Sequence, residues 1–317
     1  MKKRILTLTF ALMLALVSLT VYANEPASIN ANVRQVQFTE RLLVNASVGP
    51  ILPIVDMLRN ITLQIDLNIA AVPVATPDYI EIQGYQFSTT LTILELLDPD
   101  LTNEDIVPLR YMTNLEVLAL DNTQVSCIQP LAGLINLRDL YMRRNQISDL
   151  TPLAGLTNLD WLFLQNNQIS DLQPLAGLTN LRHLNLDNNQ ISDLQPLAEL
   201  TGLTGLSLQE NQISDLQPLA GLSNLEGLNL RINQISAIQP LAELASLMNL
   251  HLSYNQISDL TPFAGFTYLQ TATLNGNQIS DLTPLARLWN LRWLNLEDNP
   301  VTDWSPVAHV REVDGRP

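Results

Sequence analysis

Serine, histidine and aspartate residues occur together in a pattern that could support nucleophilic catalysis. Ser207 and His183 fall on neighbouring predicted strands, and Asp139 or Asp187 is not far away. A nucleophile needs a base within hydrogen-bond reach, an acid that orients the base, and a group that stabilises the oxyanion. The predicted strands form an open sheet face, which offers these residues no helix N-terminus and no enclosed pocket. The sequence therefore favours a non-enzymatic protein without catalytic residues.

The sequence gives no better support for a metal or cofactor site. His183 and His251 are three repeats apart, which is roughly 14 Å at the spacing of β-strands and too far for both to hold one ion. Cys127 is the only cysteine, so neither a cysteine-cluster site nor an intramolecular disulfide can form. The sequence also has no glycine-rich phosphate loop. We expect neither a metal nor a cofactor.

Aromatic residues gather on the predicted outward face of the strands. Tyr141 and Phe163 fall in one outward column, and Trp161 and His183 fall in the column beside it. Because consecutive members of a column lie on neighbouring strands, the four side chains should form one contiguous patch. Clustered aromatic side chains on a solvent-facing sheet are typical of interface anchors, although the rings could instead only cover the sheet and one another. We predict that these four residues bind a partner.

Polar residues and glycines border this predicted patch. In the second column, Gly205 and Gly227 should leave a bare floor beside the rings. The first column continues with polar side chains that we expect to complete the binding surface, namely Asn185, Ser207, Asn229 and His251.

Charged residues also face each other across neighbouring predicted strands. Asp121 faces Arg143 in one column, and the other column alternates in sign over four strands, through Glu116, Arg138, Asp160 and Arg182. Alternation at strand spacing generally reflects local neutralisation, worth from a few tenths to about 1 kcal/mol per pair. We expect these columns to stabilise the sheet rather than to clamp a ligand.

A strict repeat of 22 residues positions all of these side chains. Nine units follow one another without insertion or deletion, from the unit that opens at Leu115 to the unit that opens at Leu291. Inward leucines such as Leu184 and Leu186 alternate with outward residues, which is the period of a β-strand. The short return segment with its proline fits one 3₁₀ or α turn. A fixed period with one such element per unit is the signature of a solenoid.

Two polar columns belong to this scaffold. An asparagine should satisfy backbone groups of adjacent turns; Thr123 takes its place in the first unit, and it recurs as Asn145, Asn167, Asn189, Asn211, Asn233, Asn255, Asn277 and Asn299. An aspartate should cap the start of the turn, and it recurs as Asp149, Asp171, Asp193, Asp215, Asp259, Asp281 and Asp303. Calcium binding by this column is the disfavoured alternative, because the unit adds no further oxygen ligands.

The unit ISDLTPLAGLTNL, as at 147–159, resembles the 22-residue leucine-rich repeat of bacterial internalins and related exported proteins. The resemblance covers about 115–310. It implies an α/β repeat solenoid, in which a leucine-rich repeat arc or horseshoe carries a parallel β-sheet on its concave face and short 3₁₀ or α turns on its convex face. It also implies protein binding through the concave face. The sequence lacks the C-terminal anchor of internalins, so a role at a host cell surface is not implied.

The first 23 residues have the pattern of a secretory signal peptide. Lys2, Lys3 and Arg4 precede an apolar run over 5–21, and small residues favour cleavage after Ala23. An uncleaved membrane anchor is the alternative. Residue 24 is asparagine rather than cysteine, which argues against lipoprotein attachment. We expect export to the medium or to the periplasm and cell envelope, with no membrane insertion of the mature chain.

The rest of the chain should comprise a cap, a solenoid and a tail. Residues 24–90 should form a small mixed α/β cap over the first edge, with a helix at about 50–60 and strands near 41–45, 62–68 and 79–83. The solenoid is expected over 91–310 in about ten repeats. Its first repeat is irregular, with a helix over 88–98 as the rival interpretation, and its last repeat forms a C-terminal cap. Residues 311–317 should be a polar tail.

The acidity of the chain limits its partners. A net charge of −15, made more negative by loss of the basic signal, argues against nucleic acid and anionic lipid. Our leading hypothesis is an exported, monomeric, non-enzymatic protein that binds another protein on its concave sheet. One alternative is a glycan-binding module in which Trp161 or Tyr141 stacks on sugar rings. The other is a structural spacer in the cell envelope.

Overall fold

The computed structural model describes residues 76–317. The chain divides into two units, and all the described residues belong to the second unit, 75–317. The signal peptide expected at 1–23, together with the strands and helix expected between 41 and 68, lies outside the described residues.

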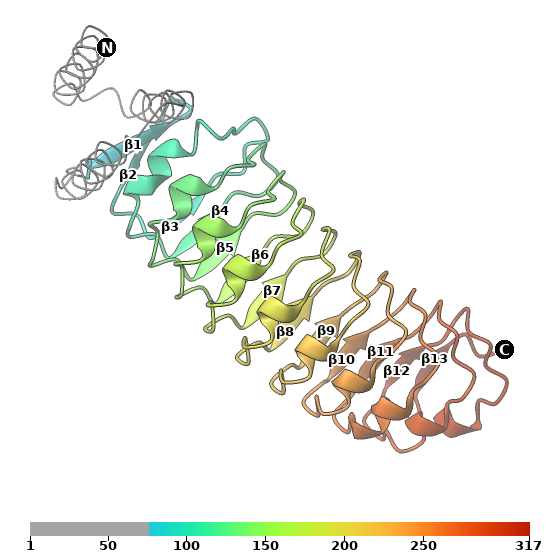
Figure 1. Ribbon diagram of the computed structural model, residues 1–317. Helices are drawn as coiled ribbons and strands as arrows, with labels where there is room; N and C mark the ends of the chain where they lie inside the picture. The colour runs from blue at the N-terminus through green and yellow to red at the C-terminus, as the bar shows by residue number, and fades with distance from the viewer. Residues whose placement is uncertain (1–75) are drawn as a thin grey trace, which may run out of the picture. The chain divides into compact units, whose positions relative to one another are not determined.

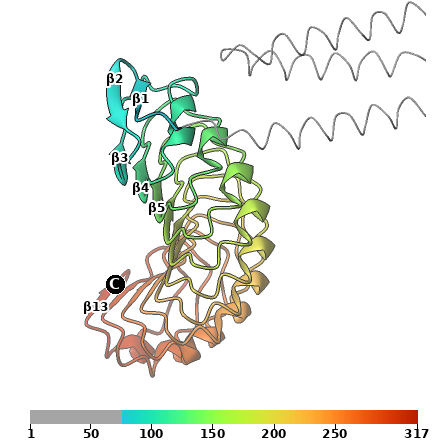
Figure 2. The same ribbon diagram turned by 90° about the vertical axis from the view of Figure 1, so that its left-hand side faces the viewer.

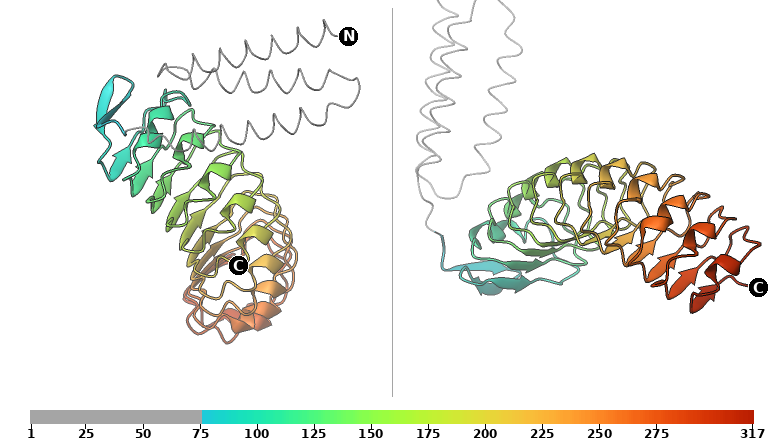
Figure 3. Two further views of the ribbon diagram at one scale, coloured as in Figure 1. Left: turned by 60° about the vertical axis from the view of Figure 1, so that its left-hand side comes forward. Right: turned by 90° about the horizontal axis from the view of Figure 1, so that it is seen from below.

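Eleven parallel strands form one continuous sheet along the solenoid (Figure 1). They follow chain order, so each repeat adds one strand beside the previous one. The strands are β3 (Ile93–Glu95), β4 (Val117–Ala119), β5 (Asp139–Tyr141), β6 (Trp161–Phe163), β7 (His183–Asn185), β8 (Gly205–Ser207), β9 (Gly227–Asn229), β10 (Asn249–His251), β11 (Thr271–Thr273), β12 (Trp293–Asn295) and β13 (Glu312–Asp314). The sheet lines the inner, concave side of this unit's arc (Figures 2 and 3).

The return segments form 3₁₀ turns on the outer, convex side of the arc (Figure 2). The turns are η1 (Val107–Tyr111), η2 (Gln129–Leu131), η3 (Thr151–Leu153), η4 (Gln173–Leu175), η5 (Gln195–Leu197), η6 (Gln217–Leu219), η7 (Gln239–Leu241), η8 (Thr261–Gly265), η9 (Thr283–Leu285) and η10 (Ser305–Val307). The predicted solenoid with a concave parallel sheet is confirmed, and the turn type is 3₁₀ throughout residues 76–317.

Apolar columns fill the space between the sheet and the turns. Leu184 and Leu186 are at most 2% exposed, as the alternation of the strand predicted. The core carries larger side chains where Phe263 and Phe266 take leucine positions, and their rings meet edge to face at 5.1 Å. Ala272 stands where the other strands of the repeat carry leucine, so the two larger side chains are accompanied by one smaller one.

The aspartates of the column accept hydrogen bonds from backbone N–H groups at the starts of the turns, as predicted. Oδ1 of Asp149 accepts the backbone N–H of Thr151 at 2.8 Å, and Asp171 makes the same contact with Gln173. Hydrogen bonds from the side chain and the backbone of Thr151 lower the pKa of Asp149, because they favour the charged carboxylate. Pro152 follows inside η3, where a missing N–H costs the turn little.

The asparagine column ties each repeat to the one before it. Nδ2 of Asn189 donates to the carbonyl oxygens of Leu164 (3.1 Å), Leu186 (3.0 Å) and Asp187 (3.2 Å). Oδ1 of the same side chain accepts the N–H of Ile169 at 3.0 Å. Leu164 and Ile169 belong to the preceding repeat, so one buried amide satisfies backbone groups that the strands do not reach.

A hairpin precedes the sheet at the N-terminal end. Strand β1 (Tyr79–Ile82), which occupies the strand predicted over 79–83, pairs antiparallel with β2 (Tyr85–Ser88). Gln83 and Gly84 both have positive φ angles, of 49° and 81°, as a two-residue hairpin turn requires. The hairpin buries Ile80 and Ile82 against the core.

The rival helix over 88–98 is wrong, because β3 forms within that segment. The neighbouring strand β4 supplies backbone partners: the N–H groups of Glu116 and Val117 donate to the carbonyl of Thr92, and Leu96 donates to Ala119. An extended segment at the edge of a sheet gains these bonds, which a helix would forgo. Residues 93–95 therefore form a strand of the same sheet as the later repeats.

The C-terminal end departs from the expected polar tail. Residues 311–317 include β13, which pairs in parallel with β12 and extends the sheet by one strand. Trp304 packs against the terminal core, as expected of a lid. Among the described residues, no helix is long and apolar enough to cross a membrane.

Candidate protein-binding surface

The strand register brings the predicted outward columns together. Tyr141 pairs with Phe163, and Trp161 pairs with His183. The four predicted polar residues follow in the first column on successive strands, as Asn185, Ser207, Asn229 and His251. All eight predicted residues therefore lie on one face, from β5 to β10.

The four aromatic residues form a continuous ladder of rings, which we call the aromatic patch. The rings of Tyr141 and Phe163 stack at 5.2 Å with an interplanar angle of 9°. Trp161 lies 5.9 Å from Phe163 and 4.0 Å from His183, measured between ring centroids. Trp161 remains 38% exposed, while the other three rings are half-buried. The patch is thus supported from within and open to solvent at its centre.

The floor beside the aromatic patch is only partly bare. The ring of His183 leans over Gly205, so a Cβ at that position would come within 2.7 Å of the His183 Nδ1 atom. A Cβ on Gly227 would meet nothing within 4 Å. The sequence prediction of an open floor is therefore wrong for Gly205, whose missing side chain makes room for His183.

We expect Gly205→Ala to displace the His183 ring from Trp161 with little effect on stability, because a side chain can rotate away more easily than backbone. The His183 ring protons should lose the ring-current shift caused by Trp161, as measured by NMR. Gly227→Ala is the matched control and should leave these signals unchanged. Equal His183 shifts in the two variants would contradict the assigned role of Gly205.

A hydrogen-bonded network fixes the polar residues beside the patch. The Ser207 hydroxyl donates to Oδ1 of Asp187 at 2.6 Å, and Nδ2 of Asn229 donates to the Ser207 oxygen at 3.0 Å. The backbone N–H of Gln209 also donates to Oδ1 of Asp187. Burial raises the pKa of Asp187, although these hydrogen bonds favour its charged form. Burial and the nearby Arg231 lower the pKa of His251.

The hydrogen bonds of Ser207 differ from those that the catalytic arrangement considered from the sequence would need. Its proton is directed to Asp187, while His183 lies between Trp161 and Thr204. No hydrogen bond joins Ser207 to His183 in the described part of the chain. The catalytic arrangement considered from the sequence is therefore not assembled in this structure.

An ion pair supports one end of the aromatic patch. Arg143 donates to Oδ2 of Asp121 through Nε at 2.9 Å and through Nη2 at 2.5 Å. The hydrogen bond with Asp121 raises the pKa of Arg143, whose guanidinium lies 6.0 Å from the centre of the Tyr141 ring. The pairing of Asp121 with Arg143 was predicted, but the contact with Tyr141 was missed. The spacing of Tyr141 and Arg143 could have predicted this contact, because alternate residues of an extended segment point to the same face.

The alternating charge column is weaker than predicted. Arg182 and Asp160 approach only to 3.9 Å, with the Arg182 side chain exposed by 69% and the Asp160 side chain by 39%. Arg138 forms no ion pair with any of the residues from 76 to 317. Exposed pairs of this kind contribute about 0–1 kcal/mol, so the column adds little to the stability of the sheet.

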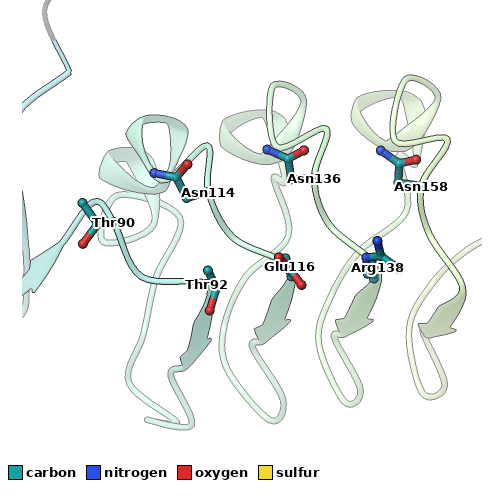
Figure 4. A pocket seen from close by; sticks show the side chains of 7 residues that line it. All are labelled: Thr90, Thr92, Asn114, Glu116, Asn136, Arg138 and Asn158. Carbon is teal, nitrogen blue, oxygen red and sulfur yellow. The ribbon is translucent and has the colours of Figure 1, made fainter.

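Two polar hollows of the described surface are lined by residues that flank the sheet. One groove of about 490 Å³ is lined by Thr90, Thr92, Asn114, Glu116, Asn136, Arg138 and Asn158 (Figure 4). A second, of about 650 Å³, shares Arg138 and Asn158 with the first. Figure 4 shows the asparagines at equivalent points of successive repeats. Asn136 and Asn158 each donate to a carbonyl of the preceding repeat, so the lining is largely scaffold.

Comparison with known proteins identifies the chain as a leucine-rich repeat protein, in agreement with its sequence and fold. The family model described as "Leucine Rich repeats (2 copies)" matches residues 113–155, 157–199 and 201–243. An internalin (InlF) of Listeria monocytogenes is 37% identical, with 73% of this chain and 70% of that chain covered and a TM-score of 0.70. Internalin C2 of the same species is 38% identical, with 60% and 85% covered and a TM-score of 0.56.

A leucine-rich repeat protein of Leptospira interrogans shares the fold at 24% identity, with a TM-score of 0.58 over 66% of this chain and 62% of that chain. No curated protein matches the chain. Leucine-rich repeat proteins of the internalin type generally mediate protein–protein interaction and are typically non-enzymatic binding scaffolds. The repeat pattern, the concave parallel sheet and the similarity to InlF together establish that the chain belongs to the internalin-type leucine-rich repeat proteins.

Proposed function

We propose that this protein recognises another protein through its concave sheet, with the aromatic patch as its anchor. The observation that carries the proposal is the unbroken contact among the rings of Tyr141, Phe163, Trp161 and His183 across three neighbouring strands. Aromatic side chains dominate the small number of residues that supply most of the binding energy at protein interfaces. Their position on an open face therefore favours recognition over a purely structural role.

Rigidity of the surface supports the same proposal. Asp121 holds Arg143 beside Tyr141, and Asp187 holds Ser207 on the neighbouring part of the sheet. Buried asparagines such as Asn189 fix each repeat to the next. A surface that is already ordered loses little conformational entropy when a partner binds. Recognition by this face would need no folding step.

The shape of the surface supports recognition of a protein, and the sequence at the N-terminus supports export. The hollows beside the sheet have polar linings and Trp161 is exposed on an open face, so the aromatic patch suits a broad protein surface better than an enclosed small molecule. A basic start, an apolar run and a small-residue cleavage pattern support export of the protein.

The test is a pull-down with the full chain from envelope and culture-medium fractions of the source organism, followed by affinity measurement with the retained protein. The triple variant Tyr141→Ala/Trp161→Ala/Phe163→Ala should weaken binding by about 30-fold or more, because interface anchors typically contribute at least about 2 kcal/mol. Isothermal titration calorimetry with the purified partner would provide the dissociation constants.

Trp289 and Tyr268 offer a matched control, because they are exposed by 74% and 61% outside the aromatic patch. The variant Tyr268→Ala/Trp289→Ala should bind as the unmodified chain does, and both variants should retain their circular dichroism spectra. Equal binding by the patch variant would place recognition elsewhere on the molecule. Retention of glycans instead of protein would favour the sugar-binding alternative.

A further inference from the structure

An aspartate borders the aromatic patch on the side of β5. Asp139 belongs to the same column as Trp161 and His183, and the register of the sheet pairs Asp139 with Trp161. His183 packs against Trp161 from the β7 side at 4.0 Å. From the β5 side, no ring of the described residues lies against Trp161. A carboxylate therefore stands beside an exposed indole ring.

The carboxylate of Asp139 has no partner among the described residues. It accepts no hydrogen bond and forms no ion pair there, and Val117 and Trp161 flank it on the neighbouring strands. Burial raises the pKa of Asp139, the nearby charge of Asp160 raises it further, and Arg138 opposes the shift. The Arg138 side chain instead lines the hollows that flank the sheet. A half-buried carboxylate without a partner costs stability, so the fold does not explain Asp139.

The same face carries a complete version of this arrangement at Tyr141. The guanidinium of Arg143 lies 6.0 Å from the centre of the Tyr141 ring, and Asp121 accepts its hydrogen bonds. A ring, a cation and a carboxylate are therefore together at that point. Trp161 and Asp139 supply a ring and a carboxylate, but no basic side chain of the described residues supplies the cation.

A cation is the group that would satisfy both the ring and the carboxylate. The face of an indole ring attracts cations more strongly than the other aromatic side chains do, and a carboxylate accepts charge-assisted hydrogen bonds from ammonium or guanidinium groups. Trp161 is 38% exposed and Asp139 is half-buried, so a side chain that arrives from solvent can reach both. The net charge of −15 adds a long-range attraction for a basic partner.

We propose that the partner protein places a basic side chain, arginine or lysine, against Trp161 and Asp139. The cation lies on the exposed indole ring and donates to the carboxylate, as Arg143 does with Tyr141 and Asp121. This inference rests on the function proposed above, because it names the chemistry of the partner at the aromatic patch. It also makes Asp139 a specificity residue, since its unpaired charge disfavours an acidic side chain at this point.

The test is a library of random linear peptides displayed on phage and panned on the full chain, followed by calorimetry with the enriched peptides. Peptides that lose affinity for Tyr141→Ala/Trp161→Ala/Phe163→Ala should contain an arginine or a lysine. Asp139→Asn should weaken their binding by about tenfold or more, because a hydrogen bond between charged groups is lost. Glu226→Gln is the matched control: it removes one negative charge from an exposed position beside β9 and should leave the affinity unchanged.

A double-mutant cycle connects Asp139 to the basic residue of the peptide. Replacing a peptide arginine by citrulline, or a peptide lysine by norleucine, should weaken binding to the unmodified chain by a similar factor. The same replacement should have little further effect on Asp139→Asn, because groups in direct contact are not additive. Two independent losses that multiply would show that the basic residue contacts another group, and would overturn the proposal.

Stability separates recognition from a structural role. Asp139→Asn removes a half-buried charge and keeps the shape of the side chain, so the melting temperature should stay the same or rise. A lower melting temperature together with unchanged peptide affinity would assign the carboxylate to the fold and overturn the proposal.

The remaining outcomes distinguish this inference from the function on which it rests. Peptides that bind through the aromatic patch but lack a basic residue, or that are insensitive to Asp139→Asn, would keep the proposed function and overturn the inference. Peptides unaffected by the triple variant of the aromatic patch would overturn both. Failure to enrich any peptide would overturn the inference alone, because the pull-down decides the proposed function.

Discussion

Replacing Phe263 with alanine is expected to lower the free energy of unfolding by about 3–5 kcal/mol, the usual cost of deleting a buried phenyl ring. Phe263 is fully buried, and its ring meets Phe266 edge to face at 5.1 Å. Phe263 belongs to η8 and its side chain lies in the continuous hydrophobic core between repeats, so a cavity there could not collapse without moving a repeat. Urea unfolding followed by circular dichroism would measure the loss from the shift in midpoint at constant slope.

Phe263→Leu is the matched control for this prediction. Leucine fills the same column in the two adjacent repeats, at Leu241 and Leu285. A leucine should therefore retain most of the packing and cost far less than alanine. If the leucine and alanine variants were equally destabilised, the loss would come from the ring contact with Phe266 and not from cavity formation.

Asn189→Ala should produce the other large effect, a loss of about 2–5 kcal/mol, because buried polar groups that lose their partners cost about 1–3 kcal/mol each. The substitution removes the acceptor for the N–H of Ile169 and a donor to the carbonyl of Leu164. Both groups belong to the preceding repeat. Hydrogen exchange should therefore accelerate at Ile169, and urea unfolding should begin at a lower concentration.

Asn180→Ala tests whether this cost is specific to the buried column. Asn180 is exposed and donates a single hydrogen bond, to the carbonyl of Thr157 at 2.7 Å. Water can replace that donor, so the variant should lose less than about 1.5 kcal/mol, the net value of an ordinary hydrogen bond. Similar losses in Asn180→Ala and Asn189→Ala would show that burial of the amide is not decisive.

The sequence was sufficient to predict the solenoid because each structural role recurs at one position of the unit. Leucine alternation identified the strands, and Pro174 with Asp171 identified a turn and its start. The same register predicted that Tyr141 lies beside Phe163, and the two residues are paired on β5 and β6. The period alone therefore predicts which residues share a column, because paired residues on neighbouring strands are a constant number of positions apart.

Side-chain directions and chain ends could not be read in this way. His183 leans over Gly205, and Ser207 turns to Asp187, because of rotamers that depend on several neighbours at once. Strand β13 carries no leucine pattern, and it is extended because β12 offers it an unpaired edge. The positive φ angle of Ile232 could not be read from its residue type, because residues as different as Arg144 and Tyr254 adopt it at the same loop position.

The strand pairing and the asparagine contacts between repeats recur at the same positions of the 22-residue unit. Strands pair at a separation of 22 residues, and Asn189 reaches back 25 residues to Leu164 and 20 residues to Ile169. A gene that duplicates or loses one whole unit would therefore rejoin chemically matching surfaces at the new junction. The sheet would lengthen or shorten by one strand, about 4.8 Å, while the rings on β5, β6 and β7 keep their own geometry. Gain or loss of whole units can thus change the length of the concave sheet without changing the residues that we propose as the anchor for a partner.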